Sequence, residues 1–152
     1  MEKYEYIQIE FNKKTKKLLQ EWSNKNIDHN DLMFCEINGE KIGGIVVKDA
    51  HMTICYGIPA DSHFLEIRKE IKKINLPAIK VRGIDFFDIK EYNTKILYFL
   101  IDDSKKILKS LNKSLQKFVS KDLKDKKDFV PHVTIAYMSN KFNIKKLKDK
   151  RF

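Results

Sequence analysis

The sequence predicts one layered domain that mixes helices and strands, of the α+β or α/β class. Apolar residues follow strand and helix spacing in the order strand, helix, hairpin, strand, helix, strand, strand, helix, strand. No linker rich in Gly, Pro or Ser interrupts the 152 residues, so 1-152 is expected to form a single domain. Two stretches, 51–56 and 132–137, repeat each other almost residue for residue, which predicts two related strands.

The first half of the chain begins with an alternating pattern. Residues 4–11 predict a half-buried strand whose polar face carries Tyr6 and Gln8. The apolar stripe of the following amphipathic helix, 15–24, places Trp22 in the core. Two apolar runs around Asn38-Gly39 then predict a hairpin that leads into the first repeated strand; the runs are 32–37 and 42–48, and the strand is 50–57.

The second half contains two more helices and three more strands. Asp61 or Ser62 is expected to cap a helix that ends at 75–77, and Ser104 one whose stripe runs from Ile107 to Phe118. Strands are expected at 79–88 and 95–102, and a charged loop, 120–128, precedes the second repeated strand. The Lys-rich segment 143–152 is expected to be a frayed helix or a mobile tail.

Each repeated stretch places a histidine and a threonine on one face of its strand. Period-2 alternation turns His51, Thr53 and Cys55 to one face, and in the second copy His132, Thr134 and Ala136. The opposite faces are expected to be buried, and they carry Met52, Ile54, Tyr56, Val133, Ile135 and Tyr137. Agreement at three positions after two histidines has a chance probability of roughly one in several thousand, which favours a functional pair over two core strands with satisfied histidines.

Two histidines and two threonines facing one cleft suit acid–base chemistry at a phosphate. An imidazole with an ordinary pKa of about 6.5 holds either protonation state near neutral pH. One ring can accept the proton of an attacking hydroxyl or water while the other gives a proton to the leaving oxygen. Threonine hydroxyls can donate to non-bridging phosphate oxygens, where charge develops.

Composition restricts the other possibilities. No apolar run is long enough to span a membrane and no signal peptide opens the chain, so a soluble cytoplasmic protein is expected, in the host cytoplasm if the chain is viral. Cys35 and Cys55 are too few for a disulfide framework and are expected to be reduced. The net charge of +10 favours an anionic partner, although lysines spread over every helix are also typical of a solvated surface.

The two motifs, His51-Met52-Thr53-Ile54 and His132-Val133-Thr134-Ile135, resemble the signature of the 2H phosphoesterase family, and Pro131 before the second motif also suits it. This family includes the bacterial 2′-5′ RNA ligase and the cyclic phosphodiesterases. The resemblance implies an α+β, two-lobed, pseudo-symmetric fold with curved antiparallel sheets, helices on the outside and a central cleft. It also implies cleavage of a phosphodiester without a metal or other cofactor, with His51, His132, Thr53 and Thr134 at the active site.

Within the family, the small size and the tyrosine that ends each motif are most similar to the phage anti-CBASS nucleases, which degrade cyclic oligonucleotide signals. A nucleotide or oligonucleotide substrate of cyclic form is therefore expected, with no membrane and no obligate protein partner. The candidate substrate contacts are Tyr6, Gln8, Phe87, Tyr56 and Tyr137. Of Phe86 and Phe87, one is expected in the core and the other at the cleft mouth.

Three other interpretations stay open. Members of the family also trim RNA ends, open 2′,3′-cyclic phosphates or cut 2′-5′ oligoadenylate, and the motif alone does not choose among these substrates. A nucleotide-binding module without turnover would not need two groups that titrate near pH 7. A metal site lacks a third ligand at a recognisable spacing, and His29 and His63 lie outside any motif and are expected at the surface.

Overall fold

The computed structural model describes residues 3–37, 39–124, 128–147, 149, 150 and 152. Its strands form two antiparallel sheets. The smaller sheet pairs β1 (Tyr4–Glu10) with β4 (His51–Pro59). The larger sheet has the order β2-β3-β7-β6-β5. Its strands are β2 (Phe34–Ile37), β3 (Glu40–Ile45), β5 (Val81–Ile89), β6 (Thr94–Ile101) and β7 (His132–Ser139). The α+β class is confirmed, and the parallel α/β alternative is wrong, because every strand pair is antiparallel.

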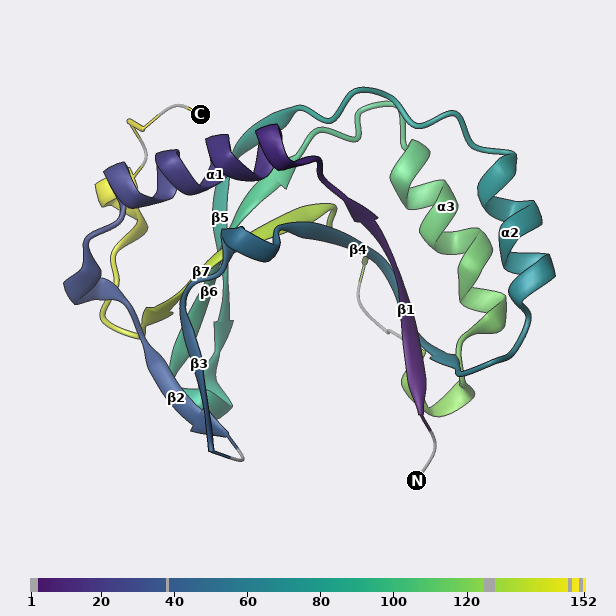
Figure 1. Cartoon of the computed structure of the whole chain (residues 1–152), viewed down its shortest axis with the longest axis horizontal. Helices are drawn as coiled ribbons and strands as arrows, with labels where there is room; N and C mark the ends of the chain where they lie inside the picture. Colours follow the sequence, from purple (N-terminus) through teal and green to yellow (C-terminus); the bar gives the residue numbers. More distant parts are fainter. Residues whose placement is uncertain (1–2, 38, 125–127, 148, 151) are drawn as a thin grey trace.

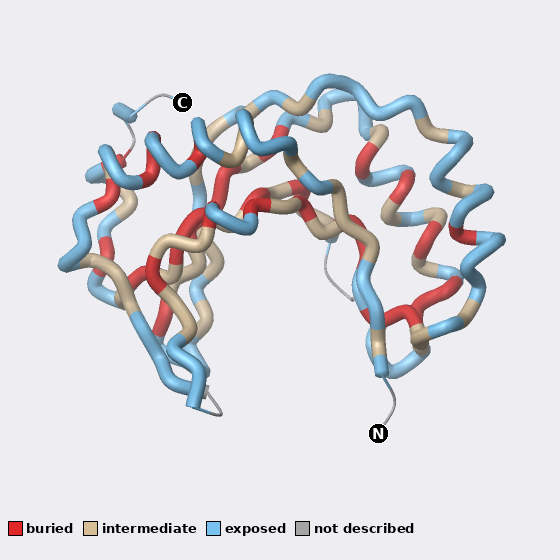
Figure 2. The backbone as a smooth tube through the Cα atoms, in the orientation of Figure 1, coloured by how far each residue is buried: buried red, intermediate tan, exposed pale blue. Residues whose placement is uncertain are grey.

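Helices cover the outside of the two sheets. The structure has α1 (Lys13–Asn26), α2 (Phe64–Lys72) and α3 (Ile107–Leu115). Figure 1 shows an arch of two lobes, with α2 and α3 beside the β1–β4 sheet and α1 across the five-stranded sheet. The buried residues follow β4, β6 and β7 and the inward side of α3 (Figure 2). The expected two-lobed arrangement is therefore confirmed.

The two lobes exchange their helices. Helix α1 follows β1 in the chain, yet its Trp22 packs edge-on against Phe99 of β6, with 4.9 Å between the ring centroids. Helix α3 follows β6, yet its Asn112 Nδ2 donates to the Ile54 carbonyl of β4 at 2.7 Å. Each helix thus packs against a strand of the opposite sheet, which ties the lobes together around β4 and β7.

The pairing of β1 with β4 repeats the pairing of β6 with β7 position by position. Gln8 lies opposite Thr53 as Tyr98 lies opposite Thr134, and Glu10 lies opposite His51 as Leu100 lies opposite His132. Both registers skip the isoleucine that follows the threonine, so Ile54 and Ile135 occupy equivalent β-bulges. The pseudo-symmetry implied by the repeated motif is confirmed at this level of detail.

The predicted hairpin forms, but it belongs to the sheet of the second motif. Strand β3 pairs with β7, through Gly44 with Tyr137 and Ile45 with Ala136. On the other side of β3, Gly43 allows the residue before β2 to come close, because a Cβ atom there would lie 2.3 Å from the Met33 carbonyl oxygen. The chain then continues through the short helix Val47–Asp49 to β4 in the other sheet.

The predicted helix caps are wrong at both α2 and α3. Helix α2 begins after His63, whose φ is 57°, while the Ser62 hydroxyl donates back to the Pro59 carbonyl at 2.6 Å. Helix α3 begins after Lys106, whose φ is 56°. The Asp103 carboxylate, rather than Ser104, accepts from the first-turn amides Leu108 and Lys109, both at 2.9 Å. In both places a residue with a left-handed backbone directly precedes the helix, and the start lies beyond the residue that ordinary spacing selects.

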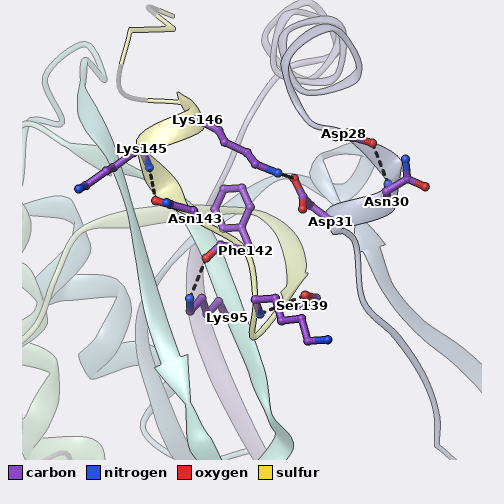
Figure 3. Close-up of polar contacts among 10 residues, drawn as sticks. Asp28, Asn30, Asp31, Lys95, Ser139, Phe142, Asn143, Lys145 and Lys146 are labelled. Carbon is purple, nitrogen blue, oxygen red and sulfur yellow. Dashed lines mark hydrogen bonds and ion pairs between the residues drawn. The ribbon is translucent and has the colours of Figure 1, made fainter.

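The Lys-rich C-terminal segment begins with residues that pack against the rest of the protein. Phe142 and Leu147 are buried, and Ile144–Leu147 form one short helix. Figure 3 shows Lys146 in contact with Asp31, at 2.8 Å, and Lys95 Nζ donating to the Phe142 carbonyl, at 2.7 Å. Phe142, directly before the segment, is thereby joined to β6, and Lys146 within the segment is joined to the turn after α1. The mobility expected for 143–152 stays a prediction.

Candidate active site

The two motif histidines begin β4 and β7, and each ring is held in the same way. Nδ1 of His51 lies 2.9 Å from the Asp49 carbonyl oxygen, and Nδ1 of His132 lies 2.7 Å from the Val130 carbonyl oxygen. A carbonyl only accepts, so Nδ1 carries a proton in both rings. The neutral form of each ring therefore keeps its lone pair on Nε2, which makes Nε2 the atom available for proton transfer.

The paired bulges decide which side chains share the histidine face. Beyond Ile54 the alternation reverses, so Cys55 is buried and Tyr56 is 55 % exposed. Beyond Ile135, in the same way, Ala136 is buried and Tyr137 is half-buried. The expected burial of Tyr56 is therefore wrong and that of Tyr137 is incomplete, because strict period-2 alternation has no place for a bulge. Both tyrosines turn to the face of the histidine and the threonine.

Aromatic side chains surround the two histidines unequally. The His132 ring lies 4.9 Å from Phe87, at an interplanar angle of 83°, and 5.1 Å from Tyr98. The aromatic ring beside His51 is Tyr6, at 6.3 Å and 52 % exposed. Burial lowers the pKa of His132 below its ordinary value, against a smaller raising effect of the Val130 carbonyl, and the charge of His51 lowers it further.

A pocket of about 240 Å³ lies between the motif strands. Thr53 and Tyr56 of β4, Phe87 of β5 and His132 of β7 line it, so it draws on both sheets. Asn112 of α3, Gln116 directly after that helix and Asp128 of the segment before β7 also line the pocket. The predicted residues His132, Thr53, Tyr56 and Phe87 are thus brought together around one hollow.

Gln8 and Tyr6 flank the first motif as expected for the polar face of the first strand. Gln8 lies opposite Thr53, and its Nε2 donates to Glu10 Oε1 at 2.7 Å. Its Oε1 is buried and has no hydrogen-bond partner among the described residues. Tyr6 lies opposite Tyr56, so two exposed phenol rings sit side by side on the histidine face.

Other sequence expectations are confirmed by burial. Phe86 packs against the core while Phe87 lies at the pocket, which is the division expected for this pair. Trp22 is buried, and His29 and His63 are exposed. Both cysteines are free thiols, and burial raises the pKa of the Cys55 thiol to about 11.

Sequence reasoning missed two residues that shape the site. Tyr98, 5 % exposed, lies opposite Thr134 and against His132. Asn112 holds the carbonyl of the Ile54 bulge from another element of the fold. Neither residue belongs to a sequence motif: Tyr98 lies within a strand pattern, and Asn112 lies on the polar side of a helix pattern. Knowing how the strands and helices pack is what reveals them.

Two further observations concern the described part of the chain. Nowhere in it do three or more His, Cys, Asp or Glu side chains gather in a way that could hold a metal ion. None of its helices has the length and apolar character needed to cross a membrane.

Comparison with known proteins places this geometry in a family. A family model described as the AKAP7 2′5′ RNA ligase-like domain matches residues 58–152, a range that includes the second motif and not the first. Two solved structures of Usb1 from Kluyveromyces marxianus share the fold at 14 % identity. One has a TM-score of 0.50, covering 95 % of this chain and 73 % of that chain. The other, with uridine monophosphate, has a TM-score of 0.51, covering 97 % and 73 %. No curated protein sequence matches the chain.

The two-lobed fold and the paired His-x-Thr strands define a phosphodiesterase of the 2H phosphoesterase superfamily. Within that superfamily, the chain belongs to the family of the AKAP7 2′5′ RNA ligase-like domain.

Proposed function

We propose that this protein cleaves phosphodiester bonds of a cyclic oligonucleotide signal without a metal ion, using His51 and His132 as general acid and base. The observation that carries the proposal is the matched anchoring of the two rings. Each Nδ1 is tied to the carbonyl two residues earlier, which leaves both Nε2 atoms for proton transfer. Binding alone would not require two titratable rings held in the same tautomer.

Thr53 and Thr134 complete the proposed machinery. Each follows its histidine by two residues on the same face, before the bulge reverses the alternation. Their hydroxyls donate to the non-bridging oxygens of the phosphate while negative charge builds up there. Removing one such donor costs roughly a hundred- to a thousand-fold in kcat in well-studied cases.

The exposed aromatic residues around the histidines support a nucleotide substrate. Tyr6 and Tyr56 are paired and exposed on one wall, Phe87 lies on the other, and Tyr137 occupies the position equivalent to Tyr56. Stacking of a base on an aromatic ring contributes about 1–3 kcal/mol per base. The tyrosine after each motif, which resembles the phage anti-CBASS nucleases, favours a cyclic oligonucleotide as the first substrate to test.

An RNA end is the second candidate substrate, supported by a different observation. The matching family is described as RNA ligase-like, and one of the structurally similar Usb1 structures contains uridine monophosphate. On this alternative, the same four residues would trim an RNA end, open a 2′,3′-cyclic phosphate or cut 2′-5′ oligoadenylate. A nucleotide-binding module without turnover is the third alternative.

The test is a turnover assay in EDTA with each substrate class offered separately. Cyclic di- and trinucleotides, 2′,3′-cyclic nucleotides, 2′-5′ oligoadenylate and a short RNA are incubated with wild type, His51→Ala and His132→Ala. The matched controls are His29→Ala and His63→Ala, since both side chains are exposed outside the site. Loss of activity in the first two variants alone supports the proposal, and the substrate that is cut identifies the class.

Two results would contradict the proposal. Turnover that survives both motif substitutions would remove the histidines from the chemistry. Binding of these ligands without any turnover in the wild type would leave the non-catalytic module as the better account.

A further inference from the structure

The lobe of the first motif lacks a strand that the lobe of the second motif has. Strand β1 corresponds to β6 in the two matched registers, and β6 carries β5 on its other edge. Among the described residues, β1 pairs with β4 alone, so no strand lies along its second edge over residues 6–10. An open strand edge is a template on which the strand of another chain can pair.

The difference between the lobes changes the burial of equivalent side chains. Ile7 and Ile9 of β1 occupy the positions that Leu97 and Phe99 have in β6. Both β6 residues lie opposite apolar residues of β5, and both are 0 % exposed. Ile7 and Ile9 have no strand on that side in the described part of the chain, and they are only partly buried. A strand beside β1 would therefore remove more apolar surface from water.

An apolar groove of about 720 Å³ lies beside the same strand, where β1 and β4 meet α2. Ile7 and Ile58 of the sheet line it together with Ile67 and Ile71 of the helix. Phe64 at the start of α2 also lines the groove, and its side chain is 71 % exposed. Because Ile7 belongs both to the open strand and to the groove, a strand added to β1 would also cover part of the groove.

The pattern that a covering strand needs follows from β5. Strand β5 presents Phe86, Asp85 and Ile84 in turn to β6, which is an apolar, a polar and an apolar residue. Residues 7–9 of β1 have the same pattern, since Gln8 lies between two isoleucines. Because the pattern is the same in both directions, a second copy of β1 running antiparallel supplies what the open edge requires. The edge is thus complementary to itself, as the interface of a two-fold dimer must be.

We propose that β1 pairs antiparallel with β1 of a second copy of this chain, about a two-fold axis that passes between the two Gln8 residues. In this register Ile7 of one copy lies opposite Ile9 of the other, and Tyr6 lies opposite Glu10, so no charge faces a like charge. The two histidine faces then form one continuous surface, because Tyr6 and Gln8 lie on that face in each copy. The pairing does not depend on the proposed function.

The first test is sedimentation velocity of the wild type at protein concentrations from roughly 1 μM to 1 mM. About 0.15 M salt limits the repulsion between two copies of net charge +10. A dimer that grows with concentration is expected, and a monomer at every concentration overturns the proposal. Gln8→Lys places two like charges opposite each other and should shift the equilibrium to monomer. The control Gln20→Lys adds the same charge at an exposed position of α1, and equal dimerisation of the two variants would contradict the pairing.

A cysteine cross-link tests the register itself. Only the residue on the two-fold axis lies opposite its own copy, and directly opposite Cα atoms are about 4.5–5.5 Å apart, within the range of a disulfide. With the exposed Cys35 replaced by Ser, Gln8→Cys should form a covalent dimer under mild oxidation, and Gln20→Cys should not. If the wild type dimerises but Gln8→Cys is cross-linked no faster than Gln20→Cys, the contact lies on another surface and the proposal is wrong.

Discussion

Gly57 allows the segment after α3 to approach the first motif strand, and replacing it should destabilise the protein measurably. Its φ is +92°, and a Cβ atom there would lie 3.0 Å from Leu123 Cβ and 3.2 Å from Val119 Cγ1. The left-handed conformation costs a residue with a Cβ roughly 1–2 kcal/mol. The forced displacement of packed neighbours adds about 1–3 kcal/mol. Gly57→Ala should therefore lower the free energy of unfolding by about 2–5 kcal/mol, or roughly 10 °C in Tm for a chain of this size.

The assay is urea unfolding followed by circular dichroism, with Gly83→Ala as the matched control. Gly83 has no heavy atom within 4 Å of an added Cβ and no positive φ, so its variant should stay within about 0.5 kcal/mol of wild type. Because the Gly57 carbonyl accepts from the Ser120 amide at 2.9 Å and Leu123 lines the pocket, Gly57→Ala should also reduce turnover. Equal stability of the two variants would refute the argument.

Three further predictions concern the interior of the site. Asn112→Ala should lower the free energy of unfolding, measured in urea, by about 1–3 kcal/mol, because it leaves the Ile54 carbonyl without its hydrogen-bond donor. The control Ser114→Ala removes a hydrogen bond within α3 and should lower this free energy less. Because the pKa of Cys55 is about 11, only about one thousandth of this thiol is ionised at pH 8. Mass spectrometry should therefore detect alkylation of the exposed Cys35 by iodoacetamide long before alkylation of Cys55, and equal rates for the two thiols would contradict the burial of Cys55. The pKa of His132 is lower in the folded than in the unfolded state, so its contribution to stability is present above about pH 6.5 and is lost as pH falls through the folded value. The loss of unfolding free energy between pH 7 and pH 5 should therefore be smaller in His132→Gln than in wild type, and an equal loss in both would contradict the sign of the shift.

The elements with clear periodicity could be predicted from the sequence. The alternation in 4–11 corresponds to β1, and the two apolar runs 32–37 and 42–48 correspond to the hairpin of β2 and β3, while Asn38 lies outside the described residues. The repeated His-x-Thr motifs located two equivalent strands because both chemistry and backbone repeat there. In each case the signal is local, so the residues that form the element are also the residues that reveal it.

The features that complete the site depend on contacts between distant residues. The bulges at Ile54 and Ile135 reverse the alternation, and nothing in the isoleucines themselves indicates this. Tyr98 contacts His132 only because β6 pairs with β7, and Asn112 reaches Ile54 only because the lobes exchange helices. Sequence patterns identify the strand a residue belongs to, but its neighbour across the sheet follows from topology.

The measurement that tests the central claim most directly compares an ordinary substrate with one whose leaving oxygen is replaced by sulfur. A sulfur leaving group departs without a proton, so it removes the need for the acid and keeps the need for the base. With both substrates in EDTA, one of the variants His51→Ala and His132→Ala should fail on the oxygen substrate and still cleave the sulfur substrate, which identifies the acid, whereas the other should fail on both. Cleavage of the oxygen substrate by both variants at the wild-type rate would contradict acid–base catalysis by the two histidines.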